Sequence, residues 1–124
     1  MNIYISHSRS FDFQKELYGP LKNSELAKSH EFIFPHDERD EPFNTKELLY
    51  SKGCDLVIAE VSYPSTGQGI ELGWADVYEI PIVCVYKEGV QISQSLGVVS
   101  KKLLMYTSAE NMIEDIAGAL KQYD

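Results

Sequence analysis

The residues of this chain best suited to chemistry follow one apolar run and a glycine-bearing turn. Residues 56–61 are nearly all β-branched or small and apolar, which is typical of a strand covered on both faces. Pro64, Gly67 and Gly69 then interrupt the pattern, and a helix is expected from about Gly69. Glu71 would lie in the first turn of that helix, where the backbone dipole favours the ionised carboxylate. A carboxylate aimed into a cleft can attack a glycosidic carbon, whereas one that only complements the dipole has no catalytic role.

The turn before Glu71 also has the composition of an anion site. Ser65 offers a hydroxyl there, and Gly67 and Gly69 allow backbone amides to approach a ligand closely. After the first expected strand, Ser8 offers another hydroxyl and Arg9 a positive charge. A plain structural turn and a solvated arginine explain the same residues, so both interpretations stay open.

Other reactive side chains show no further pattern. Three histidines and two cysteines lack metal-ligand spacing, so we expect neither a metal site nor a cofactor. Cys54 and Cys84 are expected to be free thiols in a reducing cytoplasm. Glu60, near the end of a strand, is either a second acidic group or a residue that points to solvent, and the acidic stretch 37–41 is expected to be a solvated loop.

Length and charge bound the possibilities. A chain of 124 residues with 44% hydrophobic residues predicts a single domain over residues 1–124. The net charge of -8 argues against binding to a nucleic acid polymer or to an anionic membrane. We therefore expect a small-molecule ligand that is held locally.

Short apolar runs alternate with helical patterns along the whole chain. The expected strands are residues 2–6, 32–35, 55–61, 80–86 and 102–106, and helices are expected from near Phe11, from Asn44, over 69–79 and after Ser108. The helix over 69–79 is apolar on most sides and is expected to be buried. This alternation predicts an α/β fold, a doubly wound, flavodoxin-like (Rossmann-like) parallel sheet of five strands in the order 2-1-3-4-5 with helices on both faces. Its ligand cleft would lie between strands one and three, at residues 6–11 and 63–71.

The stretch from Asp55 to Gly73 resembles the nucleoside 2-deoxyribosyltransferase family, especially its branch of 2'-deoxynucleoside 5'-phosphate N-hydrolases. That branch shows an aspartate, a run of valines, Ala-Glu-Val and Pro-Ser-x-Gly-x-Gly-x-Glu-Leu-Gly. The resemblance implies an enzyme that hydrolyses the N-glycosidic bond of (2'-deoxy)nucleoside 5'-monophosphates. Glu71 would be the nucleophile. Ser65 and Ser8 would hold the 5'-phosphate, while Tyr4 and His36 would line the nucleoside pocket.

The same resemblance implies a homodimer with shared active sites, because Ser93 stands where relatives lend a phosphate-binding serine to the neighbouring subunit. Glu47 stands where relatives carry an aspartate that orients the sugar, so it is a second catalytic candidate. Residues 44–47 also have the pattern of a capping box, which explains Glu47 without catalysis. The loop after strand one differs from the family's Gly-Ser-Ile-Arg-Gly-Gly, and the chain is short for the family.

Three alternatives remain. A deoxyribosyltransferase would exchange bases instead of hydrolysing the bond. The opening from Tyr4 to Ser8 resembles Toll/interleukin-1 receptor domains, some of which cleave NAD. A non-catalytic module would bind a nucleotide or a protein on the same sheet.

Overall fold

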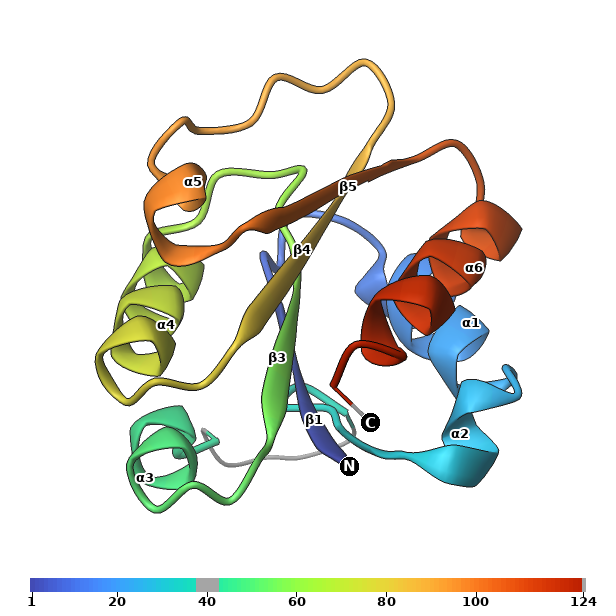
Figure 1. Ribbon diagram of the computed structural model, residues 1–124. Coiled ribbons are helices and arrows are strands. Elements are labelled where there is room, and N and C mark those ends of the chain that lie inside the picture. The colour runs from blue at the N-terminus through green and yellow to red at the C-terminus, as the bar shows by residue number, and fades with distance from the viewer. Residues whose placement is uncertain (38–42, 124) are drawn as a thin grey trace.

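The protein is built on one parallel sheet whose strands are ordered β2-β1-β3-β4-β5 (Figure 1). The computed structural model describes residues 1–37 and 43–123. The strands are β1 Asn2–His7, β2 Glu31–Ile33, β3 Leu56–Glu60, β4 Ile82–Lys87 and β5 Lys102–Tyr106. The predicted fold class and strand order are confirmed, and most of the acidic stretch 37–41 lies outside the described residues.

Helices cover both faces of the sheet. They are the π-helix η1 Gln14–Tyr18 and the α-helices α1 Gly19–Lys22, α2 Leu26–Ser29, α3 Thr45–Tyr50, α4 Thr66–Val77, α5 Leu96–Val99 and α6 Ala109–Leu120. Figure 1 shows α3, α4 and α5 on one side and α1, α2 and α6 on the other. Right-handed crossovers between parallel strands produce this division.

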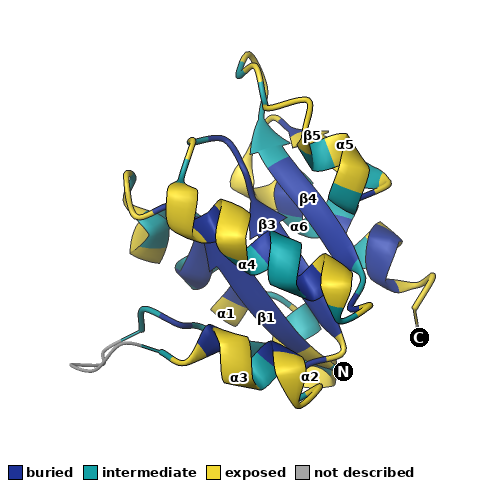
Figure 2. Cartoon of the chain, turned by 90° about the vertical axis from the view of Figure 1, so that its left-hand side faces the viewer, coloured by how far each residue is buried: buried dark blue, intermediate teal, exposed yellow. Residues whose placement is uncertain are grey.

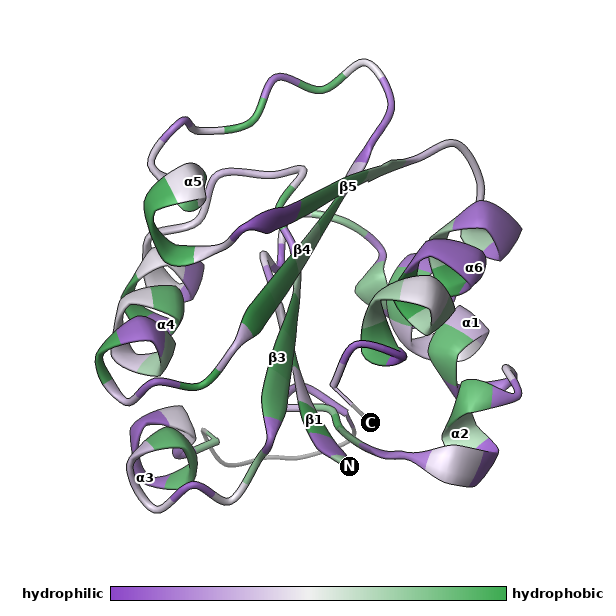
Figure 3. Cartoon of the chain, viewed as in Figure 1, coloured by the Kyte–Doolittle hydropathy of each residue, from purple (hydrophilic) through white to green (hydrophobic). Residues whose placement is uncertain are grey.

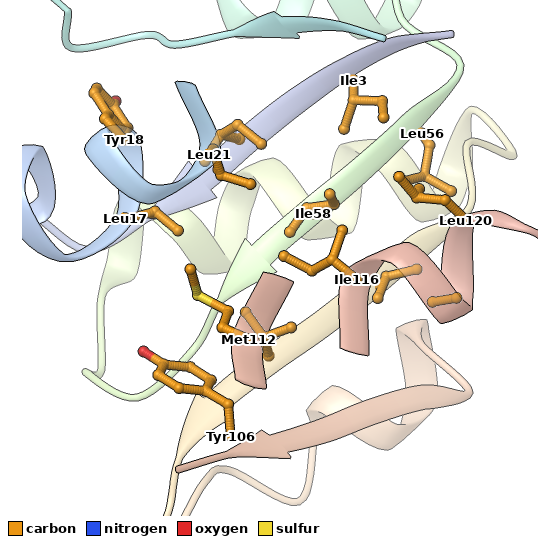
Figure 4. Packing of buried hydrophobic residues seen from close by; sticks show 14 residues of the cluster. Ile3, Leu17, Tyr18, Leu21, Leu56, Ile58, Tyr106, Met112, Ile116 and Leu120 are labelled. Carbon is orange, nitrogen blue, oxygen red and sulfur yellow. The ribbon is translucent and has the colours of Figure 1, made fainter. Parts of the chain in front are cut away.

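Alternation along the strands builds a core on each face. Ile3, Ile5 and Ile58 pack with η1, α1 and α6 in the cluster that Figure 4 shows. Tyr4 and Val57 point the other way, among side chains of α3 and α4. The central strands β1, β3 and β4 are buried (Figure 2), and they read as near-continuous hydrophobic runs (Figure 3), as expected when both faces are covered.

The helix expected from near Phe11 is divided at Gly19–Pro20 into η1 and α1, as the proline predicts, because it lacks the backbone N–H that a continuous helix needs. Helix α4 differs from the expectation. Helix α4 begins at Thr66 and not at Gly69, with Ser65 as its N-cap. It is also less buried than expected, since Ile70 is 49% exposed and Val77 is 74% exposed.

Candidate active site

Glu71 extends from α4 to the carboxyl-terminal half of β1, the predicted switch point of the sheet. The Ser6 hydroxyl donates to Glu71 Oε2 at 2.8 Å, and the Tyr4 hydroxyl donates to Oε1 at 3.1 Å. Tyr4 and Ser6 point to the same side of β1 because side chains alternate along a strand. Both carboxylate oxygens are therefore held by hydroxyl donors from one strand.

Helix α3 adds a third hydroxyl to this group. Thr45 Oγ1 lies 2.8 Å from the Tyr4 hydroxyl, and since the Tyr4 proton points to Glu71, Thr45 donates to Tyr4. Asn44 caps α3 by accepting from the backbone N–H of Glu47, which orients this first turn. The result is a directed chain from Thr45 through Tyr4 to Glu71.

The environment of Glu71 differs from the one expected of a helix start. Because α4 begins at Thr66, Glu71 lies in the second helical turn, and the dipole acts mainly on the first. Burial raises the pKa of the Glu71 carboxyl above its usual value, and the hydroxyls of Ser6, Tyr4 and Thr45 offset only part of this rise. The expected dipole-favoured ionisation is wrong; the hydroxyl donors, not the helix end, favour the carboxylate.

The N-terminus of α4 lies beside Glu71. The Ser65 hydroxyl accepts from the backbone N–H of Gln68 at 3.3 Å, so this serine caps the helix. Gly67 and Gly69 are exposed, and a Cβ added at either would meet no atom of the described residues within 4 Å beyond its chain neighbours and its own helix backbone. Open space next to free helix amides suits a bound anion.

A cavity of about 330 Å³ adjoins this helix end, between α4 and the segment that contains α5. Ser65 and Gly69 line it together with Ser93, Ser95 and the apolar Leu96. The resemblance places Ser93 in the neighbouring subunit's site. Within one chain, however, Ser93 and Ser65 already share a cavity wall.

Ser8 and Arg9 occupy different environments. Ser8 is 2% exposed, and its hydroxyl donates to Ser10 Oγ while accepting from the Ser10 backbone N–H. Arg9 is exposed. Burial lowers the pKa of His36, and the positive charge of Arg9 lowers it further. Arg9 therefore acts electrostatically on His36, while the Ser8 hydroxyl bonds within its own loop.

His36 follows β2 and is half-buried. Its ring centroid lies 5.3 Å from that of His7, and its backbone N–H donates to the Tyr18 hydroxyl at 3.2 Å. Tyr4 and His36 are brought to the same region of the sheet, since β2 pairs with β1. Tyr4 itself is fully buried, and its hydroxyl bonds Thr45 and Glu71.

Glu47 and Glu60 are the other acidic candidates. Glu47 is exposed on α3, two residues before the buried Leu49 and on a different face of the helix. Glu60 is 1% exposed and accepts from the Ser62 backbone N–H at 2.7 Å, from the Ser62 hydroxyl at 3.0 Å and from the Tyr106 hydroxyl. It does not point to solvent. It lies on the face of the sheet opposite to Glu71 and braces the loop that leads to α4.

Sequence reasoning missed Ser6 and Thr45 as partners of Glu71. Alternation along β1 puts Ser6 on the face of Tyr4, a signal that the sequence does contain. Thr45 carries no such signal, because it reads only as the first residue of a capped helix.

Among residues 1–37 and 43–123, no group of three or more metal-ligating side chains occurs. The same residues include no helix with the length and hydropathy needed to cross a bilayer. Cys54 and Cys84 are free and buried.

The chain is similar to known proteins in sequence and in fold. No family model matches the chain. A Syntrophotalea carbinolica protein named "Putative 2'-deoxynucleoside 5'-phosphate N-hydrolase 1" is 30% identical over 110 residues, which cover 79% of this chain and 77% of the relative. The 5-hydroxymethyl-dUMP N-hydrolase of Mus musculus is 31% identical over 74 residues, covering 56% of this chain and 42% of the relative.

A solved structure shares the fold. It is a CMP N-glycosidase of Clostridium botulinum with a TM-score of 0.65 and 22% sequence identity, covering 94% of this chain and 99% of that one. This similarity confirms the α/β architecture.

Proposed function

Because the chain belongs to the family of 2'-deoxynucleoside 5'-phosphate N-hydrolases, we propose that it hydrolyses the N-glycosidic bond of a nucleoside 5'-monophosphate. The products are the free base and a sugar 5-phosphate. The observation that carries this proposal is the Glu71 carboxylate, held by hydroxyls of Ser6 and Tyr4 at the switch point of the sheet.

Glu71 is the proposed nucleophile. One carboxylate oxygen attacks C1' of the sugar, the C1'–N bond breaks, and the bonding electrons leave with the base, which takes up a proton. Water then attacks C1' of the ester, and the carboxylate is released. The hydroxyl donors support this assignment because they favour the ionised carboxylate and orient it.

The phosphate is proposed to bind at the N-terminus of α4. Ser65 caps this helix, and Gly67 and Gly69 leave open space beside its free amides. Ser8 and Arg9 contribute from the neighbouring loop, and the local placement of these groups offsets a net charge of -8. On the nucleoside side, Tyr4 and His36 are the proposed contacts, with Glu47 as the group that orients the sugar.

We further propose a homodimer that shares its active sites. Exposed apolar side chains support this, since Ile70 and Val77 of α4 and Val98 of α5 lie on the same side of the sheet. Ser93 would then contribute to the phosphate site. The proposed location is the cytoplasm, where the buried thiols of Cys54 and Cys84 stay reduced. We also propose that residues 1–124 form one domain.

The test is incubation of purified protein with ribo- and deoxyribonucleoside 5'-monophosphates and with the matching nucleosides, with and without a free acceptor base. Chromatography is expected to show base and sugar phosphate from 5'-monophosphates only. Glu71→Gln should abolish release, and the exposed control Glu110→Gln on α6 should retain it. Base exchange would instead assign a transferase, and intact substrates throughout would refute the proposal.

A further inference from the structure

Tyr18 is a fully buried residue at the end of the π-helix η1, with its ring in the core beside Leu17 and Leu21 (Figure 4). We propose that its hydroxyl is a positioning group that holds together two walls of the proposed substrate site, the loop after β1 on the phosphate side and the residues after β2 on the nucleoside side. This inference rests on the proposed function, in which Ser8 and His36 contact the substrate.

The direction of each hydrogen bond around Tyr18 follows from its neighbours. His7 Nδ1 lies 2.7 Å from the Ser8 carbonyl oxygen, which can only accept, so Nδ1 carries the proton. Burial lowers the pKa of His7 to about 4, so the ring is neutral and Nε2 is an acceptor. The Tyr18 hydroxyl lies 2.6 Å from Nε2 and therefore donates to it.

The same oxygen has a lone pair for a second partner. The backbone N–H of His36 donates to it at 3.2 Å. One hydroxyl thus connects the His36 backbone to His7, and His7 connects onward to the Ser8 carbonyl. In this series of hydrogen bonds, the His36 N–H, the Tyr18 hydroxyl and the His7 Nδ1–H donate, and the Tyr18 oxygen, His7 Nε2 and the Ser8 carbonyl accept.

Contacts from α1 and from β1 also restrain the residues after β2. Lys22 of α1 forms an ion pair with Asp37 at 2.6 Å, and the His7 and His36 rings meet edge to face. The ion pair is partly exposed and screened by solvent, so the buried hydroxyl is the more specific restraint. A π-helix places one extra residue in a turn and often occurs at functional sites, and here it ends at Tyr18.

Removing the hydroxyl leaves the His36 N–H and His7 Nε2 without their partner while keeping the ring in the core. Since Tyr18 acts through His36 and Ser8, its loss should weaken substrate binding more than the chemical step at Glu71. A general loss of stability would not separate these two effects.

Tyr18→Phe is the test, and Ser100→Ala is the matched control. Ser100 is also a buried hydroxyl, but it bonds the Ile82 and Lys102 backbones between β4 and β5, at the far edge of the sheet. Tyr18→Phe is expected to raise KM for the nucleotide about tenfold, as loss of about one hydrogen bond's contribution, with kcat changed less than about twofold. Ser100→Ala should change neither. Equal KM values for the two variants would overturn the inference.

A second measurement does not depend on activity. The ¹⁵N shifts of the His7 ring in the wild-type protein should show a protonated Nδ1 and a hydrogen-bonded Nε2, and Tyr18→Phe should shift Nε2 alone. A proton on Nε2 in the wild type, or no change in the variant, would refute the role of Tyr18. If the wild type releases no base, the proposed function fails, and these shifts still decide whether the hydroxyl makes the connection.

Discussion

Ser6→Ala is the substitution that examines most directly how the protein controls Glu71. It removes the donor 2.8 Å from Glu71 Oε2 and keeps the backbone of β1 unchanged. Since that hydrogen bond lowers the pKa of Glu71 and burial raises it, the pKa should rise further in the variant.

The size of the effect follows from the charge on the acceptor. A hydrogen bond to a charged group contributes about 1.5–3 kcal/mol, and about 1.4 kcal/mol corresponds to a factor of ten. The ratio of ionised to protonated Glu71 should therefore fall about tenfold or more at every pH, and below the pKa the ionised fraction falls by a similar factor. At higher pH the carboxylate is ionised in both proteins, so the loss in kcat/KM should be smaller.

The assay is the pH profile of kcat/KM for a 5'-monophosphate substrate. The acid limb is expected to move to higher pH in Ser6→Ala, while Ser100→Ala should keep the wild-type limb, since Ser100 bonds the backbones of β4 and β5 at the far edge of the sheet. An unmoved limb in Ser6→Ala, or an equal loss at every pH, would show that Ser6 does not tune this carboxylate.

Three further substitutions have distinct expected results. Glu71→Gln should raise Tm at neutral pH, because the raised pKa means that the folded state binds more protons than the unfolded state above pH 4.5, so the stability of the wild type falls as pH rises while that of the uncharged variant does not. The gain should vanish in thermal scans below pH 4.5, and a lower Tm at neutral pH would contradict this. Gly67→Ala should stabilise α4 by up to about 1 kcal/mol and raise KM, because its methyl group enters the open space proposed for phosphate; an unchanged KM would exclude Gly67 from that site. Glu60→Gln should lower the free energy of unfolding in urea by about 1–3 kcal/mol, since the Ser62 and Tyr106 hydroxyls lose their acceptor, and stability equal to that of Glu110→Gln would refute the bracing role.

Much of the fold could be predicted because local patterns agree with it. The buried strands β1, β3 and β4 are apolar runs, and strands that alternate with helices leave few topologies once crossovers are right-handed. Caps were readable where a small polar residue precedes a helix, as at Asn44 and Ser108. The start of α4 was misplaced because two glycines hide a helix whose first turns are held by tertiary contacts, such as Gln68 Nε2 to the Glu60 carbonyl.

The solvent exposure of the apolar residues on α4 could not be predicted from the local pattern either. Ile70 and Val77 have the composition of core residues, yet both lie on the outer side of α4. Hydrophobic residues occur on protein surfaces as well as inside, so composition alone does not separate the two.

The sequence by itself determined that a carboxylate at position 71 follows a buried strand and a glycine-bearing turn, and that this turn meets the end of the first strand. Only the tertiary structure decided which groups control the carboxylate. Ser6 and Thr45 are 65 and 26 residues away from Glu71 along the chain, and their hydroxyls join its network because β1 and α3 pack against α4. Burial and hydrogen bonding then oppose each other in the pKa of Glu71, and both depend on distances that no local pattern specifies.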